Sequence, residues 1–125
     1  MDDKVTFQDI KDYHRRFTKE RKWEAFHDPK SVAMSIAIEA AELMEIFQWT
    51  NAEESFALKN NEKEYTHIKE ELSDVIMYCM SMANIMDIDV SEALADKIKK
   101  NEAKYPKDDN RYTELIDENG NVRGR

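Results

Sequence analysis

The sequence predicts an all-α protein, and two observations support that prediction. First, the only glycines of the 125-residue chain, Gly120 and Gly124, fall in its last six residues. Tight β-hairpins usually need glycine where the backbone takes a positive φ. Second, apolar residues recur three and four positions apart, which is the period of a helix that buries one face. We therefore expect one domain built from four to five helices.

The first helix is expected at about residues 7 to 22. Thr6, with Asp9 three residues later, can cap its start. Its apolar residues return at helical spacing, and they are Phe7, Ile10, Tyr13 and Phe17. A connector follows it, and this connector contains Trp23, Phe26 and His27.

The second helix is expected to begin at Asp28-Pro29, because aspartate is a good N-cap and proline suits the first helical position. The polar stretch from Asn51 to Asn61 should end it, with one short turn near Phe56. Its predicted core face consists of Val32, Ile36, Ala40, Leu43 and Phe47.

The third helix is expected from about Glu62 to Met86. A fourth should begin near Asp89, with Glu92 in a capping-box position, and must end before Pro106 because proline disfavours a preceding helical residue. The third helix should bury Ile68, Leu72, Val75, Ile76, Cys79, Met82 and Met86. Residues 1–106 would form the domain, followed by an irregular or disordered tail at 107–125 that can dock through Tyr112, Leu115 and Ile116.

The composition narrows the possible functions. A formal net charge of -8 opposes binding to a nucleic-acid polymer, whose affinity depends on clustered lysine and arginine. Without glycine before residue 120, a P-loop or Rossmann fingerprint is excluded, so any nucleotide chemistry must use side chains and metal. No apolar run is long enough to span a membrane, and a single cysteine, Cys79, favours the reducing cytoplasm.

Two acidic pairs are the strongest candidates for chemistry. Glu39 and Glu42 are three residues apart, so they share one helix face, and Glu71 and Asp74 repeat the spacing. If the two faces meet, four carboxylates converge and repel one another unless a divalent cation lies between them. Oxygen ligands favour Mg²⁺, with Mn²⁺ as the alternative. In a chain with 37% charged residues, however, such pairs are often only solvated faces.

Glu39-Ala40-Ala41-Glu42 and Glu71-Leu72-Ser73-Asp74 together resemble the ExxE and ExxD motifs of the MazG-like all-α nucleoside triphosphate pyrophosphohydrolases. The resemblance extends from about Phe7 to Pro106 and is nearest to the dCTP pyrophosphatase branch. It implies a Mg²⁺-dependent hydrolase that converts a nucleoside triphosphate to the monophosphate and pyrophosphate. It also implies a helical bundle that forms a homodimer or homotetramer, with Glu42 or Glu71 as the proton acceptor.

The same resemblance implies a set of substrate contacts. Lys104 stands where arginine is usual, and lysine keeps the charge but loses the bidentate fork. Without the resemblance, the two tryptophans would be read as core residues. The implied contacts to base and phosphate are His14, Trp23, Trp49, Lys97, Asn101, Lys104 and Tyr105.

Two other classes of protein remain alternatives. The Glu-x-x-His spacing of Glu24 with His27, and of Glu64 with His67, also occurs in di-iron carboxylate bundles. We expect the first of these pairs to lie in the connector, which argues against such a bundle. The second alternative is a non-catalytic helical module that only oligomerises. The preferred base is left open, since dCTP and modified nucleotides both fit a tryptophan-lined pocket.

Overall fold

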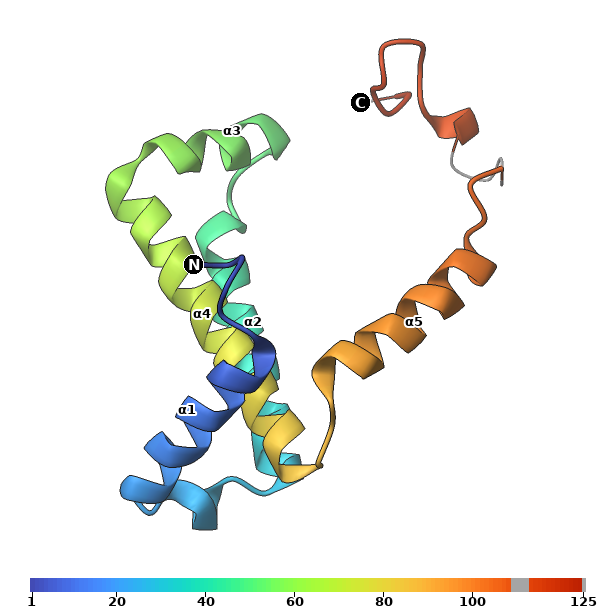
Figure 1. Ribbon diagram of the computed structural model, residues 1–125. Coiled ribbons are helices and arrows are strands. Elements are labelled where there is room, and N and C mark those ends of the chain that lie inside the picture. The colour runs from blue at the N-terminus through green and yellow to red at the C-terminus, as the bar shows by residue number, and fades with distance from the viewer. Residues whose placement is uncertain (109–112, 125) are drawn as a thin grey trace. The chain divides into compact units, whose positions relative to one another are not determined.

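The computed structural model describes residues 1–108 and 113–124, and these residues confirm the all-α prediction. Helix α1 ends two residues before its predicted end, and α3 occupies the region where one short turn was expected. Three short 3₁₀ segments lie at Trp23–Phe26, Leu58–Asn60 and Thr113–Leu115. The α-helices are α1 (Phe7–Glu20), α2 (Pro29–Phe47), α3 (Ala52–Ala57), α4 (Glu62–Ile85) and α5 (Val90–Lys104), as Figure 1 shows.

The starts of α1 to α4 are fixed by short polar side chains, as the sequence predicted for the first two. In α1 the Asp9 backbone N–H donates to Thr6 Oγ1 at 3.1 Å, and the Thr6 N–H donates to Asp9 Oδ2 at 2.9 Å. Asp28 caps α2, whereas Asn51 and Asn61 cap α3 and α4. Each cap satisfies a backbone N–H that the helix itself leaves unpaired.

Among the described residues, two take a positive φ without being glycine: Lys22, at 57°, and Asp87, at 53°. Asp87 ends α4 in a Schellman-type turn, in which the Ile88 N–H donates to the Ala83 carbonyl oxygen at 2.9 Å. A left-handed conformation costs a non-glycine residue about 1 kcal/mol. The absence of glycine therefore did not prevent positive-φ turns here.

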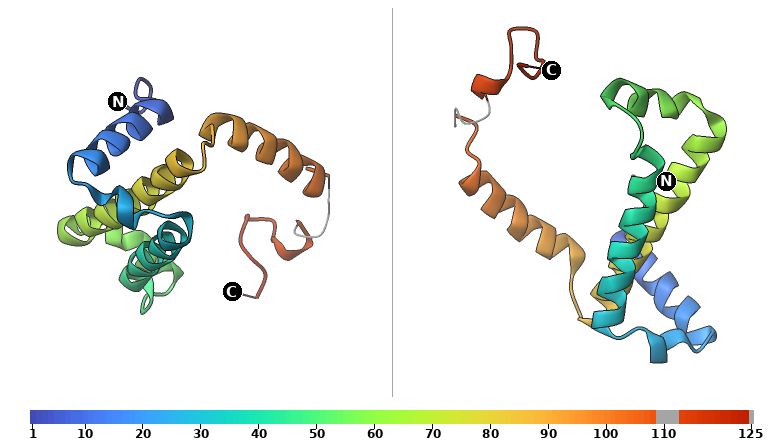
Figure 2. Two further views of the ribbon diagram at one scale, coloured as in Figure 1. Left: turned by 90° about the horizontal axis from the view of Figure 1, so that it is seen from below. Right: turned by 180° about the vertical axis from the view of Figure 1, so that it is seen from behind.

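The chain divides into two compact units, Met1–Val90 and Ser91–Arg125. In the first unit α2 and α4 run antiparallel and side by side, and α1 packs against α4 (Figures 1 and 2). Val32, Met80 and Ala83 are the buried apolar side chains of this packing. The two long helices therefore form the frame on which a site in this unit is built.

The second unit contains most of α5, the 3₁₀ segment Thr113–Leu115 and an isolated antiparallel bridge between Ile116 and Val122. Tyr112, one of the residues expected to dock the tail, lies outside the described residues. The irregular or disordered state expected for 107–125 stays a prediction. Among residues 1–108 and 113–124, no helix is both long and apolar enough to cross a membrane.

Several positions predicted to lie in the core are exposed in the single chain. Ala40 on α2, Leu72 and Ile76 on α4, and Met86 directly after α4 are all accessible, Leu72 being 47% exposed. The reason is geometric. Helices α2 and α4 each bury the face that contacts the other, and α1 covers a further part of α4. Both α2 and α4 carry additional apolar side chains outside these contact faces, and no other part of the first unit covers them. Trp49 is 88% exposed, so it is not a core residue of this chain.

Candidate metal centre and nucleotide site

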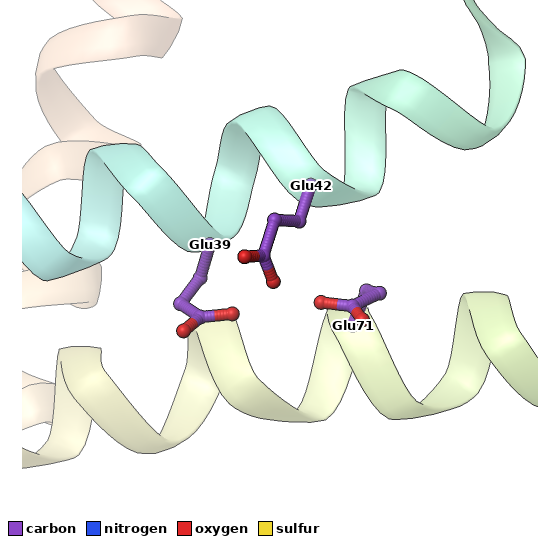
Figure 3. A group of neighbouring side chains, drawn as sticks. All are labelled: Glu39, Glu42 and Glu71. Carbon is purple, nitrogen blue, oxygen red and sulfur yellow. The ribbon is translucent and has the colours of Figure 1, made fainter.

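Three carboxylates meet between α2 and α4. Glu39 and Glu42 extend from α2, Glu71 extends from α4, and the three side chains turn toward one another across the gap between the helices (Figure 3). One carboxylate oxygen from each lies within 4.8 Å of the other two. The convergence that the sequence predicted is therefore present for these three residues.

The electrostatics of this cluster favour a bound cation. Burial raises the pKa of Glu39, and the neighbouring Glu42 raises it further through a hydrogen bond and its charge. Burial likewise raises the pKa of Glu71, with Glu42 again the next cause. One oxygen of Glu39 and one of Glu71 are buried and have no hydrogen-bond partner among the described residues. A divalent ion would relieve the repulsion and occupy these oxygens.

Asp74 lies beside this group without being part of the three-oxygen contact. Its side chain is exposed, and its charge contributes to the raised pKa values of both Glu39 and Glu71. An exposed aspartate one turn from Glu71 can approach a metal by a change of side-chain rotamer. Its role as a fourth ligand stays a prediction.

His67 was missed as a site residue by the sequence analysis, which considered it only as part of a di-iron motif. Its Nε2 lies 3.4 Å from Glu71 Oε1, across one turn of α4. The signal that could have found it is the spacing of four residues, which places two side chains on one helix face. His67 therefore acts on the Glu71 carboxylate through its charge, which lowers the pKa of Glu71 against the larger effect of burial.

Aromatic rings gather around the segment that connects α1 and α2. The Trp23 ring lies parallel to His27, with centroids 6.3 Å apart, and Tyr78 of α4 lies 6.5 Å from His27. His14, one of the predicted base contacts, is buried, and its ring lies 6.3 Å from that of His27. Neither His27 nor Tyr78 was predicted to be a site residue.

The predicted phosphate and base contacts near the C-terminus lie on or beside α5. Lys97, Asn101 and Lys104 recur three and four residues apart, so they share one face of that helix. Lys104 Nζ lies 5.3 Å from the centroid of the Tyr105 ring, a cation–π contact. These residues belong to the second unit and the carboxylates to the first. Their contact with substrate stays a prediction.

The placement of the first Glu-x-x-His pair argues against a di-iron bundle, as the sequence suggested, although the second pair, Glu64 with His67, lies within α4. Glu24 lies in the 3₁₀ segment Trp23–Phe26, and His27 directly follows it. His27 Nδ1 is 2.7 Å from the Trp23 carbonyl oxygen, so it is already engaged by the backbone. In di-iron bundles such pairs lie within the bundle helices.

An all-α domain in which two antiparallel helices bring three carboxylates together has the arrangement of a candidate metal centre. Residues 34–115 match the MazG-like family. The chain belongs to this family, as the two acidic motifs indicated.

Proteins similar to this chain are dCTP pyrophosphatases and a pyrophosphatase of known structure. dCTP pyrophosphatase 1 of Rattus norvegicus is 36% identical over 101 residues, which are 81% of this chain and 59% of that protein. The Homo sapiens protein of the same name is 34% identical over 115 residues, 88% of this chain and 68% of the relative. The crystal structure of a pyrophosphatase from Archaeoglobus fulgidus is 42% identical, with a TM-score of 0.72, covering 77% of this chain and 88% of that one. The chain spans about three fifths of the length of the rat relative.

Proposed function

We propose that this protein is a Mg²⁺-dependent nucleoside triphosphate pyrophosphatase. The observation that carries the proposal is the group of Glu39, Glu42 and Glu71, with two buried carboxylate oxygens lacking partners among the residues described. The names of the rat and human relatives make dCTP the first substrate to test, with modified nucleotides next. The name of the similar archaeal structure, a pyrophosphatase, supports the same reaction class.

In this proposal the carboxylates of Glu39, Glu42, Glu71 and Asp74 hold Mg²⁺, or Mn²⁺ in its place. When bound, the cation neutralises charge on the triphosphate and lowers the pKa of a water molecule. The oxygen of the attacking water bonds to the α-phosphorus, and Glu42 or Glu71 accepts the proton that this water loses. The bond between that phosphorus and the bridging oxygen breaks, and the electron pair leaves with pyrophosphate.

The remaining predicted residues would bind the substrate. Lys97 and Lys104 carry the positive charge that phosphate oxygens require. Trp23 and Trp49 offer ring faces on which a base can stack. The residues proposed to read or border the base are His14, Asn101 and Tyr105.

We also propose that the protein works as a homodimer or homotetramer. The exposed apolar side chains of α2 and α4 support this, because a monomer rarely leaves so many apolar groups in water. Ile38 and Met34 of α2 are each 56% exposed, and Met44 is 62% exposed. A second copy of the chain would cover such faces and complete the burial that this short chain lacks.

The reaction class is tested by its products. Incubation with dCTP and Mg²⁺ is expected to release dCMP and pyrophosphate in equal amounts, because the proposed attack is at the α-phosphorus. Anion-exchange chromatography of the nucleotides, with separate assays for pyrophosphate and orthophosphate, measures both. Stepwise release of orthophosphate with dCDP as an intermediate would contradict the proposal.

The base-stacking role is tested by replacing Trp23. Trp23→Ala is expected to raise KM for the preferred nucleotide and to narrow the differences between bases, since a stacked aromatic contributes about 1 to 3 kcal/mol per base. Tyr13→Ala removes another exposed aromatic from the neighbouring helix α1 and serves as the control. A KM that stays unchanged across a panel of triphosphates would assign Trp23 to packing alone.

A further inference from the structure

A pocket of about 590 Å³ lies directly beside the carboxylates. Glu42 and Glu45 line it from α2, and Lys63, His67 and Glu71 line it from α4. All of these residues belong to the first unit. Small-molecule sites in proteins span about 300 to 1,000 Å³, so the pocket can hold a ligand group next to the proposed metal.

The pocket lies on one side of the carboxylates along α4. Lys63 precedes Glu71 by eight residues, which places it about 12 Å toward the start of the helix. Tyr78 follows Glu71 by seven residues, about 10 Å in the opposite direction. The Tyr78 ring is 6.5 Å from His27, and His27 is stacked 6.3 Å from Trp23, the ring proposed to hold the base. The base and the pocket therefore lie on opposite sides of the carboxylates along this helix.

This order along α4 matches the order of the groups in a nucleotide. The α-phosphorus joins the sugar and base to the β- and γ-phosphates. With the α-phosphorus at Glu42 and Glu71 and the base beyond Tyr78, the two outer phosphates extend into the pocket. These phosphates are the groups that leave as pyrophosphate in the proposed reaction.

Lys63 is the positively charged group of this pocket that is available to a ligand. It is the only lysine or arginine among the described residues that line the pocket, and it is exposed. None of the ion pairs within residues 1–108 and 113–124 includes it. The other basic residue, His67, already lies 3.4 Å from Glu71 through its Nε2. A lysine ammonium carries three donors on a flexible stem, which suits the terminal oxygens of a phosphate.

Acidic side chains of the pocket make this lysine more important. Glu45 and Glu64 line the pocket together with Glu42 and Glu71. Their negative charge would repel an outer phosphate, even when Mg²⁺ at the carboxylates neutralises part of it. Lys63 supplies the opposite charge about 12 Å along α4 from Glu71. Loss of this charge should therefore weaken the binding of the outer phosphates in particular.

We infer, resting on the proposed function, that this pocket holds the β- and γ-phosphates of the substrate and that Lys63 binds the terminal phosphate. Its ammonium donates hydrogen bonds to the γ-phosphate oxygens, which are the farthest from the attacked phosphorus. After the reaction the same contact holds pyrophosphate and its Mg²⁺ until they leave. Lys63 thus favours triphosphates over diphosphates and does not contribute to the binding of the monophosphate product.

The inference is tested by calorimetry with the two products, pyrophosphate and dCMP, each in the presence of Mg²⁺. Lys63→Gln is expected to weaken pyrophosphate binding by at least about tenfold, the effect of one charge-assisted hydrogen bond. It should leave dCMP binding unchanged, because the monophosphate does not reach the pocket. The kcat/KM for dCTP should fall by a similar factor. Lys63→Arg keeps both charge and donors and should retain most of the pyrophosphate affinity.

Lys69→Gln is the matched control. It removes the same charge from an exposed lysine of α4 that does not line the pocket, and it should leave both affinities unchanged. An unchanged pyrophosphate affinity in Lys63→Gln would overturn the inference. An equal loss for pyrophosphate and dCMP would also overturn it, because that result assigns Lys63 to the fold. An equal loss of pyrophosphate affinity in Lys69→Gln would overturn it too, since net charge alone would then explain the effect.

The same measurements separate this inference from the proposed function. If the protein hydrolyses no triphosphate but binds pyrophosphate with Mg²⁺, and Lys63→Gln weakens that binding while Lys69→Gln does not, the function is wrong and the phosphate pocket stands. If triphosphates are hydrolysed to pyrophosphate and Lys63→Gln binds pyrophosphate as tightly as the unchanged protein, the function stands and the phosphate pocket is wrong. Absence of both turnover and pyrophosphate binding would overturn both.

Discussion

Replacing Glu71 by glutamine is expected to lower kcat/KM for the preferred triphosphate by at least tenfold, or about 1.4 kcal/mol of transition-state stabilisation. Glutamine keeps the shape of the side chain but loses the charge that Glu71 brings to within 4.8 Å of Glu39 and Glu42. Asp74→Asn, which removes the proposed fourth ligand, should have an effect of the same kind. Initial rates over a range of nucleotide and Mg²⁺ concentrations measure both variants.

These substitutions should not reduce the stability of the folded protein. The pKa of Glu71 is raised by burial and by the nearby carboxylates, so removing its charge relieves repulsion in the metal-free protein. Thermal melting of metal-free Glu71→Gln is expected to show no loss of stability. Glu53→Gln, at an exposed position of α3, is the matched control and should retain full activity. Normal turnover by both Glu71→Gln and Asp74→Asn would contradict the proposal and show that the acidic residues only form a solvated helix surface.

Removing divalent cations with EDTA is expected to abolish pyrophosphate release, the largest effect that we predict. The carboxylates have no lysine or arginine in salt-bridge contact among the described residues, so a cation is required to bring a triphosphate near them. The helical circular-dichroism signal should persist, because buried apolar side chains and the hydrogen bonds of Asn84 to α1 hold α1, α2 and α4 together without a metal. Added Mg²⁺ or Mn²⁺ should restore the activity.

The control is a titration with Ca²⁺, which has the same charge but prefers longer bonds and more ligands than Mg²⁺. It should bind without supporting full turnover. Undiminished hydrolysis in excess chelator would refute the metal-dependent mechanism. Loss of the helical signal on chelation would instead show that the metal is needed to build the fold.

The helices could be predicted because their signals are local. The Thr6 and Asp9 capping box and the Asp28-Pro29 start both depend on residues within one helical turn, and both are present in the structure. The convergence of Glu39 with Glu71 required one further inference, that the acidic faces of two helices meet. That inference succeeded because each pair borders an apolar stripe, and apolar stripes pack together.

Other parts of the site could not be read from spacing alone. His27 and Tyr78 are 51 positions apart in the sequence, and only the packing of the connecting segment against α4 brings their rings to 6.5 Å. The exposure of Leu72 and Ile76 likewise could not be predicted, because helical periodicity identifies an apolar face but does not tell whether another element covers it. The positive φ of Lys22 could not be predicted either, because lysine has no preference for that conformation and nothing in the sequence distinguishes this lysine from the others.

The position of the carboxylates at the contact between α2 and α4 makes the occupancy of the site part of the folding equilibrium. Glu39 and Glu42 are joined to Glu71 only through the fold, so an unfolded chain offers no preformed group of three. A ligand that binds only the native state adds about 2.7 kcal/mol of stability when its free concentration is one hundred times Kd. A rise in the melting temperature on adding a cation therefore reports that the cation binds between α2 and α4, and the concentration dependence of that rise reports how tightly it binds.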